Sequence, residues 1–215
     1  VHALGHAIRA GLIIPPVRVK QFLKGHRCTQ HTPVALAAVI EEIALQLEKM
    51  EMPTHIFLQG GVGSFPGAIC AYFWEKFPNS NIKFIVVESE HAPCLIQSAQ
   101  NNQMTSVNIK KETMMAGLSC GEPSLLGWKI LNIGTDDFVT ISDQLIPSTM
   151  RMLANNNPPI EAGESSVAGL AALIEIMNTK DIATKLKLDS ESIVLLFGTE
   201  GATDPEIYDS IIKAS

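Results

Sequence analysis

The segment GGVGS, which begins at Gly60, has the residue types that a main-chain anion site requires. Gly60, Gly61 and Gly63 allow backbone angles that other residues rarely adopt, and they lack the Cβ atoms that would block a close approach to the main chain. If a helix begins at about Ser64, with Pro66 in its first turn, successive backbone N–H groups and the positive end of the helix point at one place. A phosphate dianion suits such a place.

Other interpretations of this segment stay open. No Gly-Lys-Ser/Thr follows, as a Walker A motif requires, and Gly61, Gly63 and Gly67 meet the G-x-G-x-x-G spacing of a dinucleotide site only loosely. A strand-to-helix turn that needs glycine for steric reasons is one alternative. A nucleotide-binding module is another, because Glu88 ends a later strand where an acidic side chain would bind a ribose.

Three further loops are rich in small and polar residues. Each alone is typical of a helix cap or a turn, because Ser, Thr, Asp and Gly are the residues that helix starts require. All three lie at the ends of expected strands or helices, which favours a shared functional edge. They are MAGLSCGEP (115–123), AGESS (162–166) and GTEGATD (198–204).

The elements around these loops alternate between strand and helix. Buried strands are predicted at IFLQ (56–59), IKFIVVE (82–88), DFVTIS (137–142) and SIVLLF (192–197). Helices are predicted over residues 33–50, 68–77, 124–133, 144–155 and 163–178 and in a short segment at the C-terminus. This alternation predicts an α/β fold with a doubly wound, mostly parallel sheet, helices on both faces and functional loops at the carboxyl ends of the strands.

Composition narrows the class of partner. The chain has 215 residues, is 46% hydrophobic and carries a formal net charge of -6, so it can bury a core, and one domain is the simpler interpretation. The absence of any Lys/Arg run argues against a nucleic acid or an anionic membrane surface as partner. No apolar stretch reaches the roughly 18 to 20 residues of a bilayer span, so we expect a cytoplasmic protein.

The sequence predicts neither a metal site nor a disulfide framework. The only histidines in ligand spacing are His2 and His6, at i,i+4, where a solvated helix face is the expected explanation. We expect Trp74 and Trp128 to lie in the core. The cysteines form no C-x-x-C pair and are expected to be buried or half-buried thiols. They are Cys28, Cys70, Cys94 and Cys120.

Four motifs together resemble the diaminopropionate ammonia-lyases, which belong to the fold type II, tryptophan synthase β-like enzymes that depend on pyridoxal phosphate. The motifs follow one another over roughly residues 33–215, and MAGLSCGEP is specific to the ammonia-lyase branch. They are THIFLQGGVGSFPGA, MMAGLSCGEPSLLGWKIL, AGESSVAGLAAL and GTEGATDPEIY.

This resemblance implies pyridoxal 5′-phosphate as the cofactor. Its phosphate would be held by Gly61, Val62, Gly63 and Ser64.

The resemblance also implies the remaining contacts of the site. The Thr199 hydroxyl would hydrogen-bond the pyridine nitrogen, and Glu164 would lie at the edge of the cofactor. Ala116 and Gly117 would line the ring or the pocket of a small amino-acid substrate. The implied reaction is the α,β-elimination of 2,3-diaminopropionate to pyruvate and ammonia, and a full-length form would be a homodimer.

One part of the family pattern is not matched. The lysine that forms the Schiff base, and the acidic residues that act with it, lie upstream of the glycine loop in the family, and residues 1–32 match none of those segments. Neither Lys20 nor Lys24 lies in a recognisable context, so no catalytic residue is assigned. We therefore expect an unmatched leader (1–32) and the C-terminal part of a lyase domain (33–215), truncated at its N-terminus. An inactive fragment or a non-catalytic remnant that binds phosphate or a partner is the alternative to an active lyase.

Overall fold

The computed structural model describes residues 51–214. Several predictions lie outside these residues: the helix over residues 33–50, the extent of the leader, the His2/His6 pair, and the environments of Lys20, Lys24 and Cys28.

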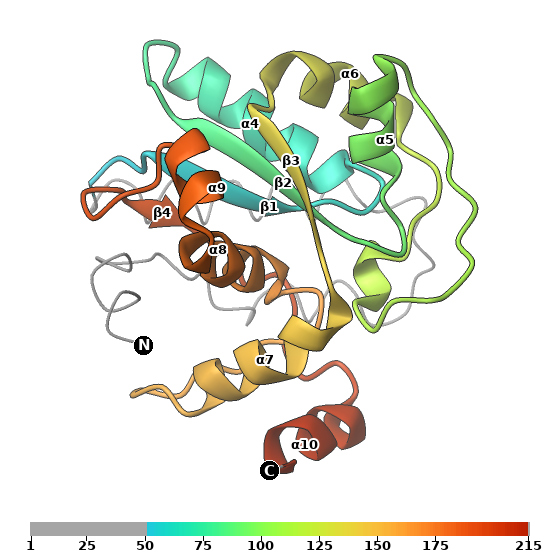
Figure 1. Ribbon diagram of the computed structural model, residues 1–215, viewed down its shortest axis with the longest axis vertical. Coiled ribbons are helices and arrows are strands. Elements are labelled where there is room, and N and C mark those ends of the chain that lie inside the picture. The colour runs from blue at the N-terminus through green and yellow to red at the C-terminus, as the bar shows by residue number, and fades with distance from the viewer. Residues whose placement is uncertain (1–50, 215) are drawn as a thin grey trace.

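Within the described residues, four parallel strands form the central sheet (Figure 1). They are β1 (His55–Gln59), β2 (Lys83–Ser89), β3 (Asp137–Ile141) and β4 (Val194–Leu195). Their order is β3-β2-β1-β4, so the chain steps outward from β1 to β3 and then returns to pair β4 on the other side of β1. This is a doubly wound sheet, and the predicted fold class is confirmed. All four carboxyl ends meet at one edge.

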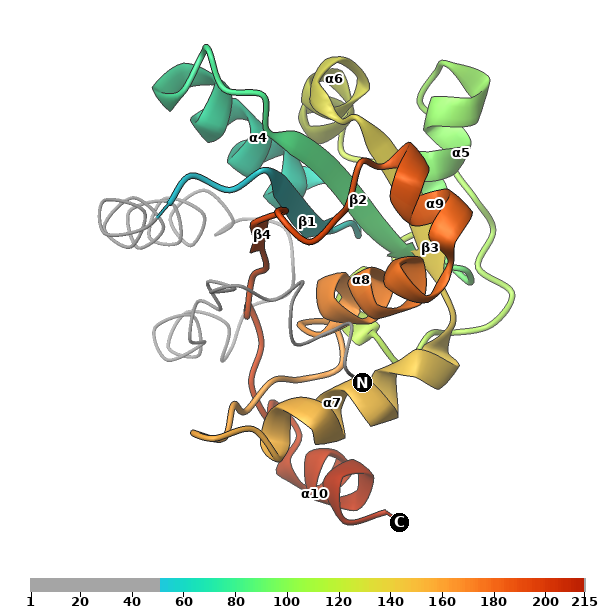
Figure 2. The ribbon, with the colours of Figure 1, turned by 60° about the vertical axis from the view of Figure 1, so that its left-hand side comes forward.

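Helices cover both faces of the sheet (Figures 1 and 2). One face carries α4 (Ser64–Lys76), α5 (Cys94–Asn101) and α6 (Leu125–Gly134). The other carries α7 (Ile146–Ala154), α8 (Ala168–Asn178) and α9 (Lys180–Lys185), with α10 (Pro205–Lys213) packed on α7. Two short 3-10 turns complete the described elements: η1 (Ala116–Leu118) follows α5, and η2 (Asp143–Leu145) precedes α7.

The strands are apolar throughout because both of their faces are buried. Phe57 of β1 packs into the cluster under α7 and α8, whereas Ile56 and Leu58 pack into the cluster under α4, α5 and α6. In β2, Ile85 and Val86 divide between the two clusters in the same way. A strand buried on two sides reads as a continuous hydrophobic run, which is why β1 and β2 are evident in the sequence.

Close packing of α4 on α6 fixes the start of α4. The two helices meet at Gly67 and Gly127, where a Cβ on Gly127 would lie 2.6 Å from the carbonyl oxygen of Gly63 and a Cβ on Gly67 would lie 3.2 Å from the Gly127 Cα. No side chain fits into this space. The crossing therefore presses the glycine loop and the first turn of α4 against α6.

Several elements differ from the sequence predictions. The helix predicted from residue 163 begins at Ala168, and the strand predicted over residues 192–197 pairs only at Val194–Leu195. The helices α5 and α9 were not predicted. Trp128 is buried, but the prediction for Trp74 is wrong: its side chain is 36% exposed and lies across Gly134. Cys70 and Cys94 are buried and Cys120 is half-buried, as expected.

Candidate cofactor site

The glycine loop has the backbone conformation that its sequence suggests. Gly61 and Gly63 have φ angles of 60° and 89°, in the left-handed region that favours glycine. The helix α4 begins at Ser64, four residues before the predicted helix (68–77) and where the phosphate interpretation requires a helix start. Its N-cap, Gly63, has no side chain to cap the helix. The main-chain N–H groups at the start of α4 are therefore not capped by the side chain of the N-cap residue.

The hydrogen bonds of this turn leave several neighbouring main-chain N–H groups without an acceptor among the described residues. The Gly60 N–H donates to Val87 O (2.8 Å), and the Gly63 N–H donates to Gly60 O (3.2 Å). Within residues 51–214, the N–H groups of Gly61, Val62 and Ser64 have no acceptor. Neighbouring unpaired N–H groups at the positive end of a helix form an anion site, so the loop fits a phosphate.

Neighbouring elements hold the glycine loop in place. The Val62 carbonyl accepts the N–H of Ser124 at 2.7 Å, and the Cys94 thiol donates to the Gly61 carbonyl at 3.5 Å. Burial raises the pKa of Cys94 to about 12, which keeps its sulfur protonated as a donor. A Cβ on Gly61 would lie 3.1 Å from Gly117 O. The glycine loop thus touches the MAGLSCGEP loop directly.

The MAGLSCGEP loop is fixed at its base by Asp143. The Asp143 carboxylate accepts the N–H of Met114 at 3.0 Å and the hydroxyl of Thr113. The Thr113 oxygen in turn accepts the N–H of Met115 at 3.2 Å. These bonds place the turn η1, with Ala116 and Gly117 exposed, beside the glycine loop.

The remaining two loops join the same edge through Ser165 and Glu200. The Ser165 hydroxyl oxygen accepts the N–H of Gly117 at 3.0 Å, and the Ser165 N–H donates to Glu200 Oε2 at 2.9 Å. The Gly163 N–H donates to Glu200 O at 3.0 Å. All four loops predicted from the sequence therefore form one continuous set of contacts.

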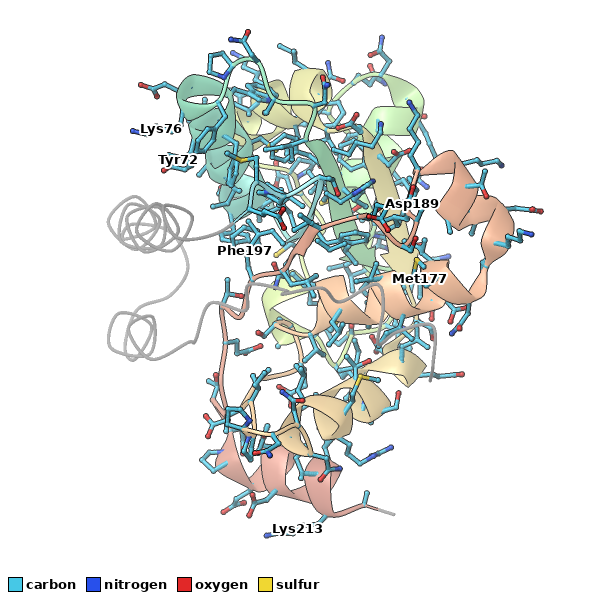
Figure 3. All side chains as sticks on the ribbon, turned by 90° about the vertical axis from the view of Figure 1, so that its left-hand side faces the viewer. Tyr72, Lys76, Met177, Asp189, Phe197 and Lys213 are labelled. Atoms are coloured by element: carbon cyan, nitrogen blue, oxygen red, sulfur yellow. The ribbon has the colours of Figure 1, made fainter. Side chains whose placement is uncertain are left out.

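Gln59, at the carboxyl end of β1, ties this edge to the sheet. Its buried side-chain N–H₂ donates to Ser166 O at 3.0 Å and to Phe197 O at 2.6 Å. The ring of Phe197 packs edge-on against Phe65 in the first turn of α4, with centroids 5.6 Å apart, and lies beside that end of the helix in Figure 3. The segment that carries Thr199 is thereby held next to the start of α4.

Two carboxyl groups at this edge have raised pKa values. Burial raises the pKa of Glu88 to about 7, although the N–H groups of Leu95 and Ile96 donate to its two oxygens at 2.9 and 2.8 Å. Burial also raises the pKa of Glu200, and the nearby Glu164 carboxylate raises it further. Both groups belong to the walls of the site and point at main-chain donors.

The structure brings the predicted site residues to one edge of the sheet. The phosphate residues are contiguous, and Glu164 and Thr199 are half-buried in the two loops that Glu200 joins. Sequence reasoning missed three residues with structural roles here: Ser165, Glu200 and Gln59. Their signal was weak, since Ser165 and Glu200 stand within predicted loops and Gln59 is a polar residue at the end of an apolar strand.

The described part of the chain contains no candidate metal centre. Residues 51–214 contain no group of three or more His, Cys, Asp or Glu side chains that could hold a metal ion. The same residues include no helix with the length and apolarity needed to cross a membrane.

Comparison with known proteins decides the family. Residues 21–198 match the family described as "Pyridoxal-phosphate dependent enzyme", which is most of the chain and includes the glycine loop. The chain belongs to the pyridoxal-phosphate-dependent enzymes. The cofactor of this family is pyridoxal phosphate. The N–H groups of Gly61, Val62 and Ser64, which have no acceptor within residues 51–214, and the positive φ angles of Gly61 and Gly63 fit its phosphate.

The similar proteins include diaminopropionate ammonia-lyases. The chain is 42% identical over 170 residues to that of Salmonella typhimurium and 34% identical over 183 residues to that of Escherichia coli. These matches cover 75% and 82% of this chain but 42% and 46% of the relatives, so the matched part spans less than half of their length.

Solved structures agree with this family. A crystal structure of the Escherichia coli diaminopropionate ammonia-lyase superposes with a TM-score of 0.75 at 32% identity, covering 83% of this chain and 47% of that chain. Maize serine racemase, at 18% identity and a TM-score of 0.65, shares the fold; the match covers 86% of this chain and 53% of that chain.

Proposed function

We propose that this chain forms the phosphate- and ring-binding part of a pyridoxal-phosphate-dependent ammonia-lyase that converts 2,3-diaminopropionate to pyruvate and ammonia. The observation that carries the proposal is the row of N–H groups at Gly61, Val62 and Ser64, which have no acceptor among the described residues, at the edge where the other three motif loops meet. The similarity to two diaminopropionate ammonia-lyases supports the choice of substrate.

Each part of the site has a proposed role. The N–H groups of Gly61, Val62 and Ser64 bind the phosphate, with Gly63 shaping the loop around it, and they set the position of the cofactor ring. The Thr199 hydroxyl donates to the ring nitrogen, a neutral contact that leaves the ring less electron-withdrawing than a carboxylate would. Glu164 lies at the ring edge, and Ala116 and Gly117 line the substrate side. When bound, pyridoxal phosphate supplies an electron sink for a carbanion at the substrate α-carbon.

Residues 33–215 form, in this proposal, the C-terminal part of a lyase domain. By resemblance to the family, the lysine that attaches the cofactor covalently belongs upstream of the glycine loop, so the proposal assigns it to no residue of this chain. We propose a cytoplasmic location, a small amino acid as substrate and a homodimer for the full-length enzyme. The alternative is a non-catalytic remnant that binds the cofactor phosphate without turnover.

A nucleotide-binding module is less well supported. Glu88 would have to reach a ribose, but its side chain is buried and both of its carboxylate oxygens accept main-chain N–H groups of α5. That position leaves it no surface for a sugar hydroxyl.

The test adds pyridoxal phosphate to the full chain, with inorganic phosphate as competitor, and then 2,3-diaminopropionate. We expect saturable binding of the cofactor that inorganic phosphate weakens, and release of pyruvate and ammonia if the chain is an active lyase. Cofactor binding without pyruvate supports the remnant. Borohydride reduction followed by peptide mapping locates any lysine adduct, and one reduced lysine within this chain contradicts the assignment of the anchor elsewhere. Absence of cofactor binding contradicts the proposed site as a whole.

A further inference from the structure

We propose that Ser165 and Glu200 are positioning residues, whose hydrogen bonds hold the backbone of Gly117 and with it the turn η1 at the substrate side of the site. The proposal rests on the proposed function for the identity of the ligand at this edge. The hydrogen bonds themselves belong to the chain and are testable without any ligand.

The contacts form a relay across three loops that are far apart in sequence. The N–H of Gly117 donates to the Ser165 hydroxyl oxygen at 3.0 Å, and the N–H of Ser165 donates to Glu200 Oε2 at 2.9 Å. The fit is tight at both ends. A Cβ on Gly117 would lie 2.9 Å from Ser165 Oγ, and a Cβ on Gly163 would lie 2.8 Å from Glu200 Cγ.

A carboxylate suits the end of this relay because it accepts hydrogen bonds and donates none. By accepting the Ser165 N–H, the Glu200 carboxylate fixes the backbone of Ser165 and with it the position of the Ser165 hydroxyl. The hydroxyl oxygen in turn accepts the Gly117 N–H. Glu200 therefore holds Ser165 in place, and Ser165 holds Gly117.

The position of η1 has consequences for the phosphate site as well. Gly117 O lies close to Gly61, where an added Cβ would come within 3.1 Å of it. Movement of η1 would therefore change both the substrate side and the wall of the glycine loop. Asp143 holds the base of the loop separately through Met114 and Thr113, so loss of the relay frees the tip of the loop without unfolding it.

The neighbouring Ser166 provides a matched control. Its side chain is as buried as that of Ser165, each residue being 7% exposed, but its hydroxyl has no hydrogen-bond partner among the described residues. Ser165→Ala and Ser166→Ala thus remove the same atom from adjacent buried positions, and only the first removes the relay.

The first measurement is the hydrogen exchange of the Gly117 amide in the full chain, read by NMR as a protection factor. We expect Ser165→Ala to lower this factor by about tenfold or more, since about 1.4 kcal/mol corresponds to tenfold and a hydrogen bond contributes that much. Ser166→Ala should leave it within about twofold, and Ser165→Thr should restore most of it. Equal protection of Gly117 in folded Ser165→Ala and in the unmodified chain overturns the proposal.

A pH series on the unmodified chain tests Glu200 without any substitution. Burial raises the pKa of Glu200, and among the described residues the titratable group that raises it further is Glu164. Protection of Gly117 should fall as the pH drops through that raised pKa, because a protonated carboxyl accepts the Ser165 N–H less strongly and so holds Ser165 less firmly. In Glu200→Gln the protection should be low and independent of pH. A pH-independent protection factor in the unmodified chain contradicts the role of Glu200.

A ligand measurement separates this proposal from the proposed function. We expect Ser165→Ala to weaken binding of pyridoxal phosphate by about tenfold, while Ser166→Ala changes the exchange of Gly117 little. If the unmodified chain binds no pyridoxal phosphate, the proposed function fails, and the exchange data still decide whether the relay holds η1.

Discussion

At the scale of single residues, Gly61 combines two constraints that no other residue type satisfies. Its φ of 60° is costly for a residue with a Cβ, by about 1–2 kcal/mol, and a Cβ would press on Gly117 O at 3.1 Å. We expect Gly61→Ala to lower the free energy of unfolding by about 1–2 kcal/mol and to weaken binding of pyridoxal phosphate at least tenfold. Urea unfolding and a binding titration measure the two effects.

Lys187 provides the control for this prediction. It has a φ of 59° after the end of α9, on a loop that contributes none of the four motifs. Lys187→Gly should raise the stability by about 1 kcal/mol, because glycine adopts this conformation without strain, and it should leave cofactor binding unchanged. Unchanged binding of pyridoxal phosphate in Gly61→Ala would show that the glycine loop is not part of the cofactor site.

At the scale of elements, α5 depends on a carboxylate from another part of the chain. Both oxygens of Glu88, at the end of β2, accept N–H groups in the first turn of this eight-residue helix. Such a carboxylate satisfies donors that a short helix otherwise leaves unpaired. The same contact places Cys94 under Gly61, so the start of α5 also supports the glycine loop.

Glu88 gives the protein a pH-dependent stability. Burial raises its pKa from 4.5 to about 7, so the folded state binds this proton more tightly than the unfolded state does. Its contribution is full below pH about 4.5 and is lost as the pH rises through about 7, a change of roughly 3 kcal/mol. Urea unfolding between pH 5 and 8 should show this decline, and Glu88→Gln should abolish it. Glu75→Gln, at an exposed carboxyl, is the control and should keep the decline. If the decline in stability persists in Glu88→Gln, a group other than Glu88 causes it.

The elements that sequence reasoning missed are those set by distant contacts. The segment that forms α5 is only eight residues long, and its first turn is completed by Glu88, which no local pattern reveals. The start of α8 moves to Ala168 because Glu200 holds the preceding turn through Ser165. By contrast, β1, α4 and β2 were predictable, since burial on both faces and the glycine loop leave clear local patterns.

At the scale of the whole molecule, the doubly wound sheet is what gathers the four motifs. Parallel strands place their carboxyl ends at one edge, so loops from residues 60 to 201 meet although they are far apart in sequence. The sequence predicted this edge and the conformation of the glycine loop. It did not predict the contacts among the loops, because Gln59, Ser165 and Glu200 bind main-chain groups whose positions only the fold determines.

A ligand that binds this edge should therefore stabilise the whole molecule and not one loop alone. Binding to the folded state adds RT ln(1 + [L]/Kd), about 2.7 kcal/mol when pyridoxal phosphate is present at 100 times its Kd. Pyridoxal, which lacks the phosphate, should stabilise far less at the same concentration, and Gly61→Ala should reduce the difference between the two ligands. Urea unfolding of the full chain with each ligand makes the measurement. Equal stabilisation by pyridoxal and by pyridoxal phosphate would mean that the N–H groups of Gly61, Val62 and Ser64 do not hold the phosphate, because that group is the only chemical difference between the two ligands.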